Sequence, residues 1–329
     1  MTKPKRSAHI IVSDQEPGLP YSKGLMASQV MVTGLSPYRS YQVAERIEDR
    51  LVDQGRTSIT SDELRDLAVE VLGELAGERY ATNFVRWEKV SALDVPMVVL
   101  IGGATGVGKS TIATQIAARL GIVRVIPTDA VREVMRAMFS GELMPTLYTS
   151  SFEADSALRE PPGRPADPVI VGFREQTAAV AVGIRALIER AALEGTSVII
   201  EGAHLVPGFL DVWTFAERVV PVPLVVTVED EELHRSHFAA RSADSSARPF
   251  GRYLTNFENI RRVQKYIKSQ ALSHGWPIVP SYNLDQTIGA VIDLVVEKAT
   301  ERAGLRRGAA PAAPEEPASV LELEGGRPI

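Results

Sequence analysis

The sequence contains no cysteine, which excludes disulfide bonds, thiolate catalysis and cysteine-ligated metal sites. This composition is typical of a protein of the reducing cytoplasm, where we expect it to be located. Long apolar runs are lacking too, since none approaches the roughly 20 residues that a helix needs to span a bilayer. Near the N-terminus the apolar run at residues 9–12 is too short for a secretory signal peptide. We therefore expect no membrane association.

An excess of basic charge is also lacking. The net charge is −5 at pH 7, from 36 Lys and Arg against 41 Asp and Glu. This balance excludes a global positive field that would attract nucleic acid, although it allows a local basic patch. Hydrophobic residues make up 45% of the chain, as is usual for a globular protein, and 329 residues suffice for about two domains.

Residues 1–92 are predicted to form a small, mostly helical domain that begins with a short strand near residues 8–13. Ser36 can cap the first long helix, and Pro37 would occupy its first position, where the missing N–H costs nothing. Thr60 and Glu63 have the spacing of a capping box at the start of the next helix.

Residues 93–304 show a different pattern, in which continuous apolar runs alternate with helical segments. Such runs indicate strands that are buried on both faces of a sheet, and their alternation with helices predicts a doubly wound parallel α/β sheet of about five strands. The last helix would be capped by Asp285. Residues 305–329 are rich in Pro, Ala, Gly and Glu and are predicted to be a disordered tail. The strand-like runs are residues 95–101, 123–129, 196–202, 222–230 and 276–281.

The stretch 103–110, GATGVGKS, matches the phosphate-loop pattern G-x-x-x-x-G-K-[ST] at every fixed position. It follows a buried strand and precedes a helix, so backbone N–H groups and the helix N-terminus would hold the phosphates of a nucleotide. Lys109 would contact the β- and γ-phosphates, and Ser110 would bind Mg²⁺. A glycine turn with a chance lysine is the alternative, and the strand–loop–helix context argues against it. The expected nucleotide contacts are Gly103, Thr105, Gly106, Gly108, Lys109, Ser110 and Thr111.

Glu201 stands near the end of the run 196–202, where phosphate-loop proteins carry a second acidic residue. Its carboxylate would join Ser110 at Mg²⁺ and orient a bound water or the attacking group. The alternative is a loop carboxylate that faces solvent. ATP and Mg²⁺ are the expected cofactors, and Lys109 and Glu201 are expected to be catalytic.

Asp129 follows the second strand of this pattern, at the sheet edge where open α/β proteins bind ligands. Its carboxylate can accept the proton of an attacking hydroxyl or position that hydroxyl, and the alternative is a helix N-cap. Arg132 and Arg136 stand four residues apart on the following helix. They would bind a carboxylate or phosphate of the acceptor, or else form a solvated basic face.

The segment 231–268 is rich in basic residues and is typical of a lid that closes over the phosphates. Lid arginines neutralise the charge that develops on the transferred phosphoryl group and exclude water. We expect Arg241 and Arg248 to be catalytic, and Arg235 and Arg252 to contact the substrate. A solvated helix face is the alternative for the whole segment.

His234 and His237 lie in the same segment, where they would donate hydrogen bonds to anions or serve a structural role. They lack the H-x-x-x-H spacing of a metal site, so no zinc is expected. The arginines around one phosphate loop favour a small anionic acceptor. Water as the acceptor would require a positioned glutamine or a partner's arginine, and the sequence indicates neither.

Six blocks in order resemble the 2-phosphoglycerate kinases, phosphate-loop kinases known chiefly from archaea. They are IGGATGVGKSTIATQIAARLGI, PTDAVREVMR, MPTLYTSSFEA, IIEGAHLVPG, HRSHFAARS and RPFGRYLTNFENIRRVQKYI. The N-terminal stretch PYSKGLMASQVMVTGLSPYRSYQVAERIEDRL is similar to a domain of the ATP-cone type. The resemblance covers about residues 8–300.

This resemblance implies transfer of the ATP γ-phosphate to the C3 hydroxyl of 2-phosphoglycerate, which gives 2,3-bisphosphoglycerate. Asp129 would meet the hydroxyl and the arginines would meet the two anionic groups. His204, in the block IIEGAHLVPG, joins the residues expected to contact the substrate. For the ATP-cone-like domain the resemblance implies an allosteric or packing role, with Lys23 as the expected phosphate contact if nucleotide binds there.

Other functions stay open from the sequence. Related kinases act on other phosphorylated acceptors, such as mevalonate 3-phosphate or an inositol phosphate. A nucleotide-sensing regulatory protein would bind ATP and change shape without productive transfer. A polynucleotide kinase would use residues 231–268 as its binding strip, but the net charge and the lack of interleaved aromatic residues weigh against nucleic acid. The oligomeric state is left open.

Overall fold

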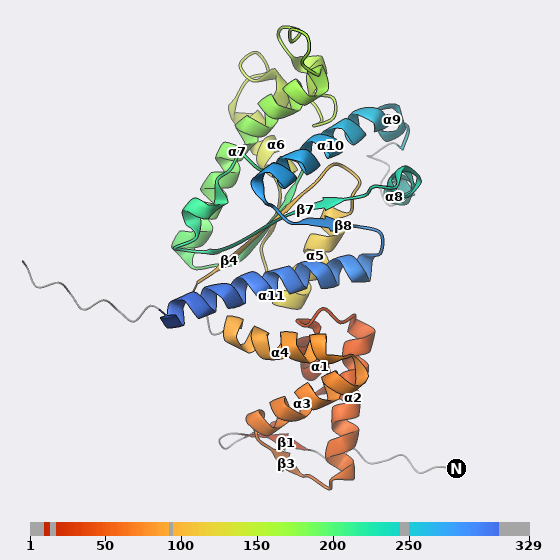
Figure 1. Ribbon diagram of the computed structural model, residues 1–329, viewed down its shortest axis with the longest axis vertical. Coiled ribbons are helices and arrows are strands. Elements are labelled where there is room, and N and C mark those ends of the chain that lie inside the picture. The colour runs from red at the N-terminus through yellow and green to blue at the C-terminus, as the bar shows by residue number, and fades with distance from the viewer. Residues whose placement is uncertain (1–9, 14–17, 92–94, 244–249, 309–329) are drawn as a thin grey trace, which may run out of the picture.

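The computed structural model describes residues 10–13, 18–91, 95–243 and 250–308. Figure 1 shows a mostly helical N-terminal region (red to orange) below an α/β part (yellow to blue), with the long helix α11 lying between them. Each part buries its own cluster of hydrophobic side chains. The predicted order, a small helical region followed by a parallel α/β sheet, is therefore confirmed.

The N-terminal region packs its helices beside a small sheet with strand order β2–β1–β3. The strand predicted near residues 8–13 is present as β1, which pairs with β2 in antiparallel and with β3 in parallel orientation. The elements are β1 (Ile11–Val12), β2 (Leu19–Pro20), α1 (Lys23–Met31), α2 (Pro37–Asp53), β3 (Ser58–Ile59), α3 (Ser61–Leu75) and α4 (Glu78–Ser91).

Two predicted helix starts are confirmed. The Ser36 side chain accepts a hydrogen bond from the backbone N–H of Arg39 at the start of α2, and Pro37 occupies the first helical position. Thr60 and Glu63 form a complete capping box at the start of α3. Both caps satisfy N–H groups that have no partner within the helix itself.

The prediction that Asp285 caps the last helix is wrong. Helix α11 begins at Leu284, so Asp285 already lies inside its first turn. The Oδ1 atom of Asn283 accepts the backbone N–H of Gln286 at 3.1 Å instead. A capping side chain must stand just before the first helical residue, and Asn283 has that place.

The five strands predicted within residues 93–304 form one parallel sheet, with the order β5–β6–β4–β7–β8. The strands β4, β6 and β7 are buried along their whole length, as their continuous apolar runs predict. The bounds are β4 (Met97–Gly102), β5 (Val125–Pro127), β6 (Val198–Gly202), β7 (Val220–Thr227) and β8 (Ile278–Pro280).

The helices α5 to α10 lie between these strands along the chain, and α11 follows the last strand. Helix α11 continues to Gly308, past the start of the predicted tail at residue 305, and the rest of that tail lies outside the described residues. Among the described helices, none combines the length and the apolar character that a membrane span requires. The elements are α5 (Lys109–Leu120), α6 (Thr128–Met138), η1 (Pro145–Tyr148), η2 (Ala154–Ala157), α7 (Pro168–Glu194), η3 (Val212–Phe215), α8 (Glu231–Ala243), α9 (Phe250–Thr255), α10 (Phe257–His274) and α11 (Leu284–Gly308).

The register of the sheet brings the candidate residues to one edge. Ile101 of β4 and Pro127 of β5 both align with Glu201 of β6. Because these strands are parallel, the phosphate loop after β4, the start of α6 after β5 and the loop after β6 meet at the same carboxyl edge.

The two parts of the molecule contact each other through α4 and α11. Asn83 of α4 is buried, and its Nδ2 donates to Oδ1 of Asp293 on α11 at 2.6 Å. Arg79, also on α4, forms an ion pair with the same carboxylate. One aspartate of α11 therefore satisfies two polar groups of the N-terminal region.

Replacing Asp293 with alanine should destabilise this contact, because it removes a hydrogen bond of the buried Asn83 amide. We expect the free energy of unfolding to fall by about 1–3 kcal/mol. Glu301→Ala is the matched control on the same helix, because among the described residues Glu301 forms only a surface pair with Lys298 and should matter by about 0.5 kcal/mol or less. Urea unfolding of the two variants measures both effects, and equal losses would contradict a specific role for Asp293.

Candidate active site

The phosphate loop lies between β4 and α5, as predicted. At Gly106 the φ angle is 89°, and a Cβ atom there would collide with the ring of Phe238, so both the backbone and its neighbour require glycine. Lys109 is buried, and its Nζ donates to the carbonyl oxygen of Ala104 at 2.8 Å. The ammonium group thus lies against the phosphate loop, where the β- and γ-phosphates of a nucleotide are expected to bind.

Two histidines of α8 fasten this loop. His234 Nε2 donates to the carbonyl oxygen of Thr105 at 2.8 Å, and His237 Nδ1 donates to that of Gly106 at 2.9 Å. These ring nitrogens must be the donors, because a carbonyl oxygen can only accept. Burial lowers the pKa of His234 to about 4, so its ring is neutral at pH 7. The structural interpretation of this pair is therefore favoured.

Glu201 is buried on β6, and its Oε1 accepts a hydrogen bond from Ser110 Oγ at 2.7 Å. Within the described part of the chain, no lysine, arginine or histidine forms an ion pair with this carboxylate. A buried carboxylate without a cationic partner costs free energy, which a bound cation would offset. The burial argues against a carboxylate that faces solvent.

Asp129 lies in the first turn of α6, and Pro127 holds the N-cap position. The alternative that Asp129 caps this helix is therefore not supported. Its side chain is 78% exposed, and its Oδ1 lies 3.6 Å from Nε of Arg132. An exposed carboxylate at the carboxyl edge of the sheet is accessible to a ligand.

His204 is buried behind this edge and has protein partners on both ring nitrogens. Nδ1 lies 2.9 Å from Thr128 Oγ1, and Nε2 lies 2.9 Å from Gln176 Oε1. The Gln176 amide nitrogen donates to the carbonyl oxygens of Thr146 and Thr149, so its Oε1 accepts from His204 Nε2 and Nδ1 accepts from Thr128. Burial lowers the pKa of His204 to about 4. His204 thus supports the site as a neutral residue rather than facing a ligand.

Arg132 is mostly buried against the chain that follows α6. Its Nη1 donates to the carbonyl oxygens of Leu147 at 2.7 Å and Thr149 at 3.3 Å, and its Nη2 donates to Glu133 at 2.8 Å. Asp129 and Arg132 are also close enough to His204 that their charges act on its pKa, as does Lys109. These residues therefore belong to one site.

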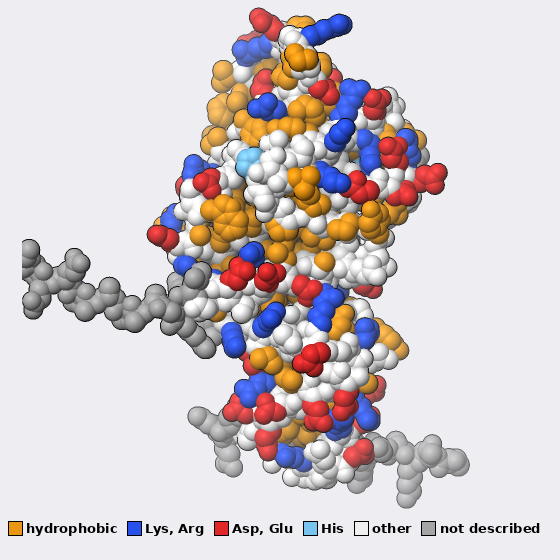
Figure 2. Space-filling view, in the orientation of Figure 1, with side chains coloured by type: hydrophobic (Ala, Val, Ile, Leu, Met, Phe, Trp, Pro, Cys, Tyr) orange, Lys and Arg blue, Asp and Glu red, His pale blue; other side chains and the backbone are white. Residues whose placement is uncertain are grey.

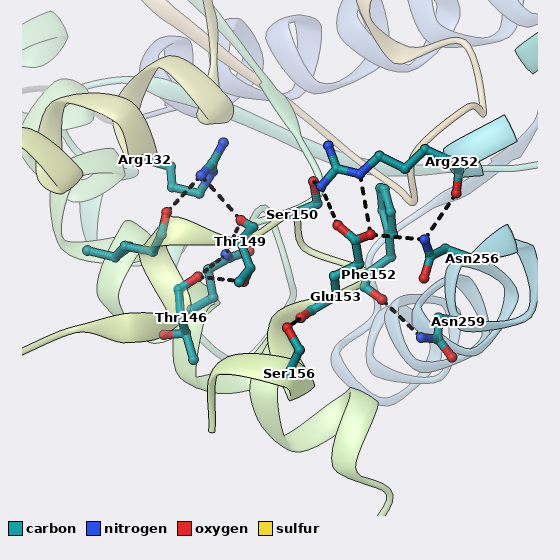
Figure 3. A network of polar contacts seen from close by, with 12 residues as sticks. Arg132, Thr146, Thr149, Ser150, Phe152, Glu153, Ser156, Arg252, Asn256 and Asn259 are labelled. Carbon is teal, nitrogen blue, oxygen red and sulfur yellow. Dashed lines mark hydrogen bonds and ion pairs between the residues drawn. The ribbon is translucent and has the colours of Figure 1, made fainter. Parts of the chain in front are cut away.

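Arg252 reaches the same region from α9. Its Nε and Nη2 contact the carboxylate of Glu153, and Nη2 also donates to Ser150 Oγ at 2.9 Å (Figure 3). Asn256 Nδ2 donates to Glu153 Oε1 at 2.9 Å. This network borders a cavity of about 480 Å³. The cavity is lined by Tyr148, Thr149, Glu153, Asp155, Ser156, Arg252, Asn256 and Asn259.

Two other arginines expected to contact the substrate have partners within the protein. Arg136 pairs with Glu133 at 2.8 Å and lies over the ring of Tyr148. Arg235 lies over the ring of Phe257, with its guanidinium carbon 3.8 Å from the ring centroid. Their assignment as substrate contacts stays a prediction.

The two predicted lid arginines are not located by the structure. Arg241 lies in α8, but its side chain is not described, and Arg248 lies outside the described residues. Their assignment as catalytic residues stays a prediction. In the N-terminal region, Lys23 forms an ion pair with Glu48 at 3.0 Å.

Many basic side chains of the segment 231–268 have acidic partners. This pairing reduces the positive charge that a nucleic acid would meet there. On the face drawn in Figure 2, Lys and Arg side chains are interspersed with Asp and Glu over both parts of the molecule. The pairs are Arg235–Glu231, Arg252–Glu153, Arg261–Glu231, Arg262–Glu258 and Lys268–Glu229.

The sequence did not identify Thr128, Gln176 or Glu153. Gln176 is a fully buried polar residue on α7, and its place near the start of a long apolar helix is a signal that could have revealed it. Glu153 gives no such signal, because its partners lie far away along the chain and are known only from the fold. Thr128 precedes Asp129 but shows its role only through its contact with His204.

Comparison with known proteins extends the similarity beyond the phosphate loop. Residues 98–258 match the family model described as an AAA domain. A 2-phosphoglycerate kinase of Methanopyrus kandleri is 39% identical over 285 residues, 85% of each chain. That of Methanothermobacter thermautotrophicus is 40% identical over 274 residues, 83% of this chain and 89% of the other. That of Pyrococcus furiosus is 35% identical over 297 residues, 89% of this chain and 94% of the other. Since the similarity spans the N-terminal region as well as the kinase fold, the chain belongs to the 2-phosphoglycerate kinase family.

Proposed function

We propose that the protein transfers the γ-phosphate of ATP to the C3 hydroxyl of 2-phosphoglycerate, giving 2,3-bisphosphoglycerate and ADP. The observation that carries the proposal is the similarity to 2-phosphoglycerate kinases over most of the chain, together with an exposed aspartate beside the phosphate loop. A bond forms between the C3 oxygen and the γ-phosphorus, and the bond from that phosphorus to the β,γ-bridging oxygen breaks.

The donor side consists of the phosphate loop and Glu201. Backbone N–H groups of the loop and the N-terminus of α5 would bind the phosphates, and Lys109 would turn from Ala104 toward the β- and γ-phosphates. Ser110 and Glu201 fit a Mg²⁺ site, because a hydroxyl and a buried carboxylate without a cationic partner in the described chain are ligands that this ion prefers. Mg²⁺ would supply charge neutralisation at the phosphates.

The acceptor side consists of Asp129, Arg132 and Arg252. The Asp129 carboxylate would orient the C3 hydroxyl and accept its proton as the new bond forms. Arg132 and Arg252 would bind the carboxylate and the phosphate of the acceptor. The lid arginines Arg241 and Arg248 would neutralise the phosphoryl group during transfer, and Arg136 and Arg235 would assist binding only after rearrangement.

The proposed reaction can be tested directly by ³¹P NMR with Mg²⁺-ATP and one acceptor at a time. The panel is 2-phosphoglycerate, 3-phosphoglycerate, glycerate, mevalonate 3-phosphate and no acceptor. We expect the 2,3-bisphosphoglycerate signal with 2-phosphoglycerate only, and its loss in Lys109→Ala. Turnover with another acceptor would keep the kinase and contradict the substrate. ATP binding without any turnover would favour a regulatory protein.

Replacing Asp129 with asparagine keeps the size of the side chain but removes its ability to accept a proton. If Asp129 is the base, kcat should fall by about 10²- to 10⁴-fold while the KM for ATP changes little. Steady-state kinetics with 2-phosphoglycerate measure both values. A kcat close to that of the wild type would contradict the assignment.

Glu201→Gln should weaken the use of Mg²⁺, because the amide lacks the negative charge of the carboxylate. We expect the Mg²⁺ concentration for half-maximal activity to rise by at least about tenfold. Glu189→Gln is the matched control, since in the described part of the chain Glu189 forms only a surface pair with Arg185 on α7. The same Mg²⁺ dependence in both variants would show that Glu201 does not hold the ion.

A further inference from the structure

The short segment 145–157, which includes η1 and η2, accepts hydrogen bonds from two arginines that lie outside it and far apart in the sequence. Two of its carbonyl oxygens accept hydrogen bonds from Arg132 of α6. Ser150 and Glu153 of the same segment bind Arg252 of α9. Figure 3 shows the two guanidinium groups on the same side of this segment. One stretch of backbone therefore sets how both groups lie relative to each other.

Glu153 holds Arg252 by one edge of its guanidinium group. The carboxylate contacts Nε and Nη2, and the amide of Asn256 holds the carboxylate in turn. Within the described part of the chain, Nη1 has no hydrogen-bond partner, and Figure 3 draws it without a dashed line. Because the guanidinium group is planar and rigid, hydrogen bonds at the edge formed by Nε and Nη2 fix the direction in which Nη1 points.

The exposure of this ion pair argues for a directional role. The Arg252 side chain is 50% exposed and that of Glu153 is 25% exposed. Ion pairs with such access to solvent contribute little to stability. Donation of hydrogen bonds to the Glu153 carboxylate also raises the pKa of Arg252, so the arginine stays charged beside the cavity. A carboxylate repels anions, so Glu153 is not suited to contact an anionic acceptor itself, and its contacts with Arg252 are the role that the geometry offers.

We propose that Glu153 is a positioning residue for the acceptor: its carboxylate holds Nε and Nη2 of Arg252 so that Nη1 meets an anionic group of the acceptor. The proposal rests on the proposed function, because it assumes that the acceptor binds against Arg252. It also gives the segment 145–157, most of which lies in the block MPTLYTSSFEA, the task of fixing the two arginines that would recognise the acceptor.

The test is steady-state kinetics of the full-length enzyme with Glu153→Gln, which keeps the shape of the side chain and removes its charge. The KM for 2-phosphoglycerate should rise by about tenfold or more, because the guanidinium group loses its fixed direction. The kcat value should change less than about threefold, and the KM for ATP should stay the same. Glu153→Asp, which keeps the charge, should restore part of the affinity.

Matched variants separate positioning from a general loss of structure. Glu258→Gln makes the same chemical change in a surface pair with Arg262 on α10, and it should leave every kinetic constant unchanged. Ser150→Ala removes another contact of Nη2 without a change of charge, and it should raise the KM for 2-phosphoglycerate by a smaller factor. This second variant serves if Glu153→Gln does not fold.

The decisive comparison is with Arg252→Gln, alone and combined with Glu153→Gln. If Glu153 acts only through Arg252, the double variant should have the same KM for 2-phosphoglycerate as Arg252→Gln. Effects that multiply, or a Glu153→Gln variant with the wild-type KM while Arg252→Gln is impaired, would overturn the positioning role and leave the proposed function intact. A wild-type KM in Arg252→Gln would overturn the placement of the acceptor itself, and this proposal with it.

Discussion

The hydrogen bond between Ser110, in the first turn of α5, and Glu201, on β6, joins the phosphate-loop segment to the neighbouring strand, and the rest of the site is arranged around that junction. It exists because β4 and β6 are paired in parallel with Ile101 opposite Glu201, so the phosphate loop and the carboxylate leave the sheet at the same edge. Gly202 allows the next contact. Its φ angle is 156°, and a Cβ atom there would collide with the side chain of Thr128 at the start of α6. A change in this register would separate donor and acceptor residues together.

Three histidines hold the elements that carry the charged groups. His234 and His237 fix the phosphate loop through its carbonyl oxygens, and His204 connects Thr128 to Gln176. Burial keeps His204 and His234 neutral at pH 7, so they add no positive charge near the phosphates. The charge that would act on the ligands is left to Lys109 and the arginines, while His204 and His234 fix their neighbours without adding charge.

The sequence was sufficient for the fold and for the position of the phosphate loop. Continuous apolar runs identify strands buried on both faces, and the pattern around Lys109 is specific because its chemistry requires glycines, lysine and serine at fixed spacing. The acceptor side was harder to predict. The role of Glu153 depends on partners about 100 positions away, and His204 has a role that only its burial reveals. One local pattern, the cap of α11, was also misassigned, because Asn283 and Asp285 stand two positions apart and either could have preceded the helix.

The central claim is that the acceptor lies between Asp129 and the two arginines held by the segment 145–157. The most direct test is a crystal structure of the protein with 2-phosphoglycerate and a non-hydrolysable ATP analogue. The account predicts the C3 hydroxyl within hydrogen-bond distance of the Asp129 carboxylate, and the acceptor's carboxylate and phosphate at Arg132 and Arg252. An acceptor bound away from Asp129, with both arginines still held only by protein groups, would contradict it.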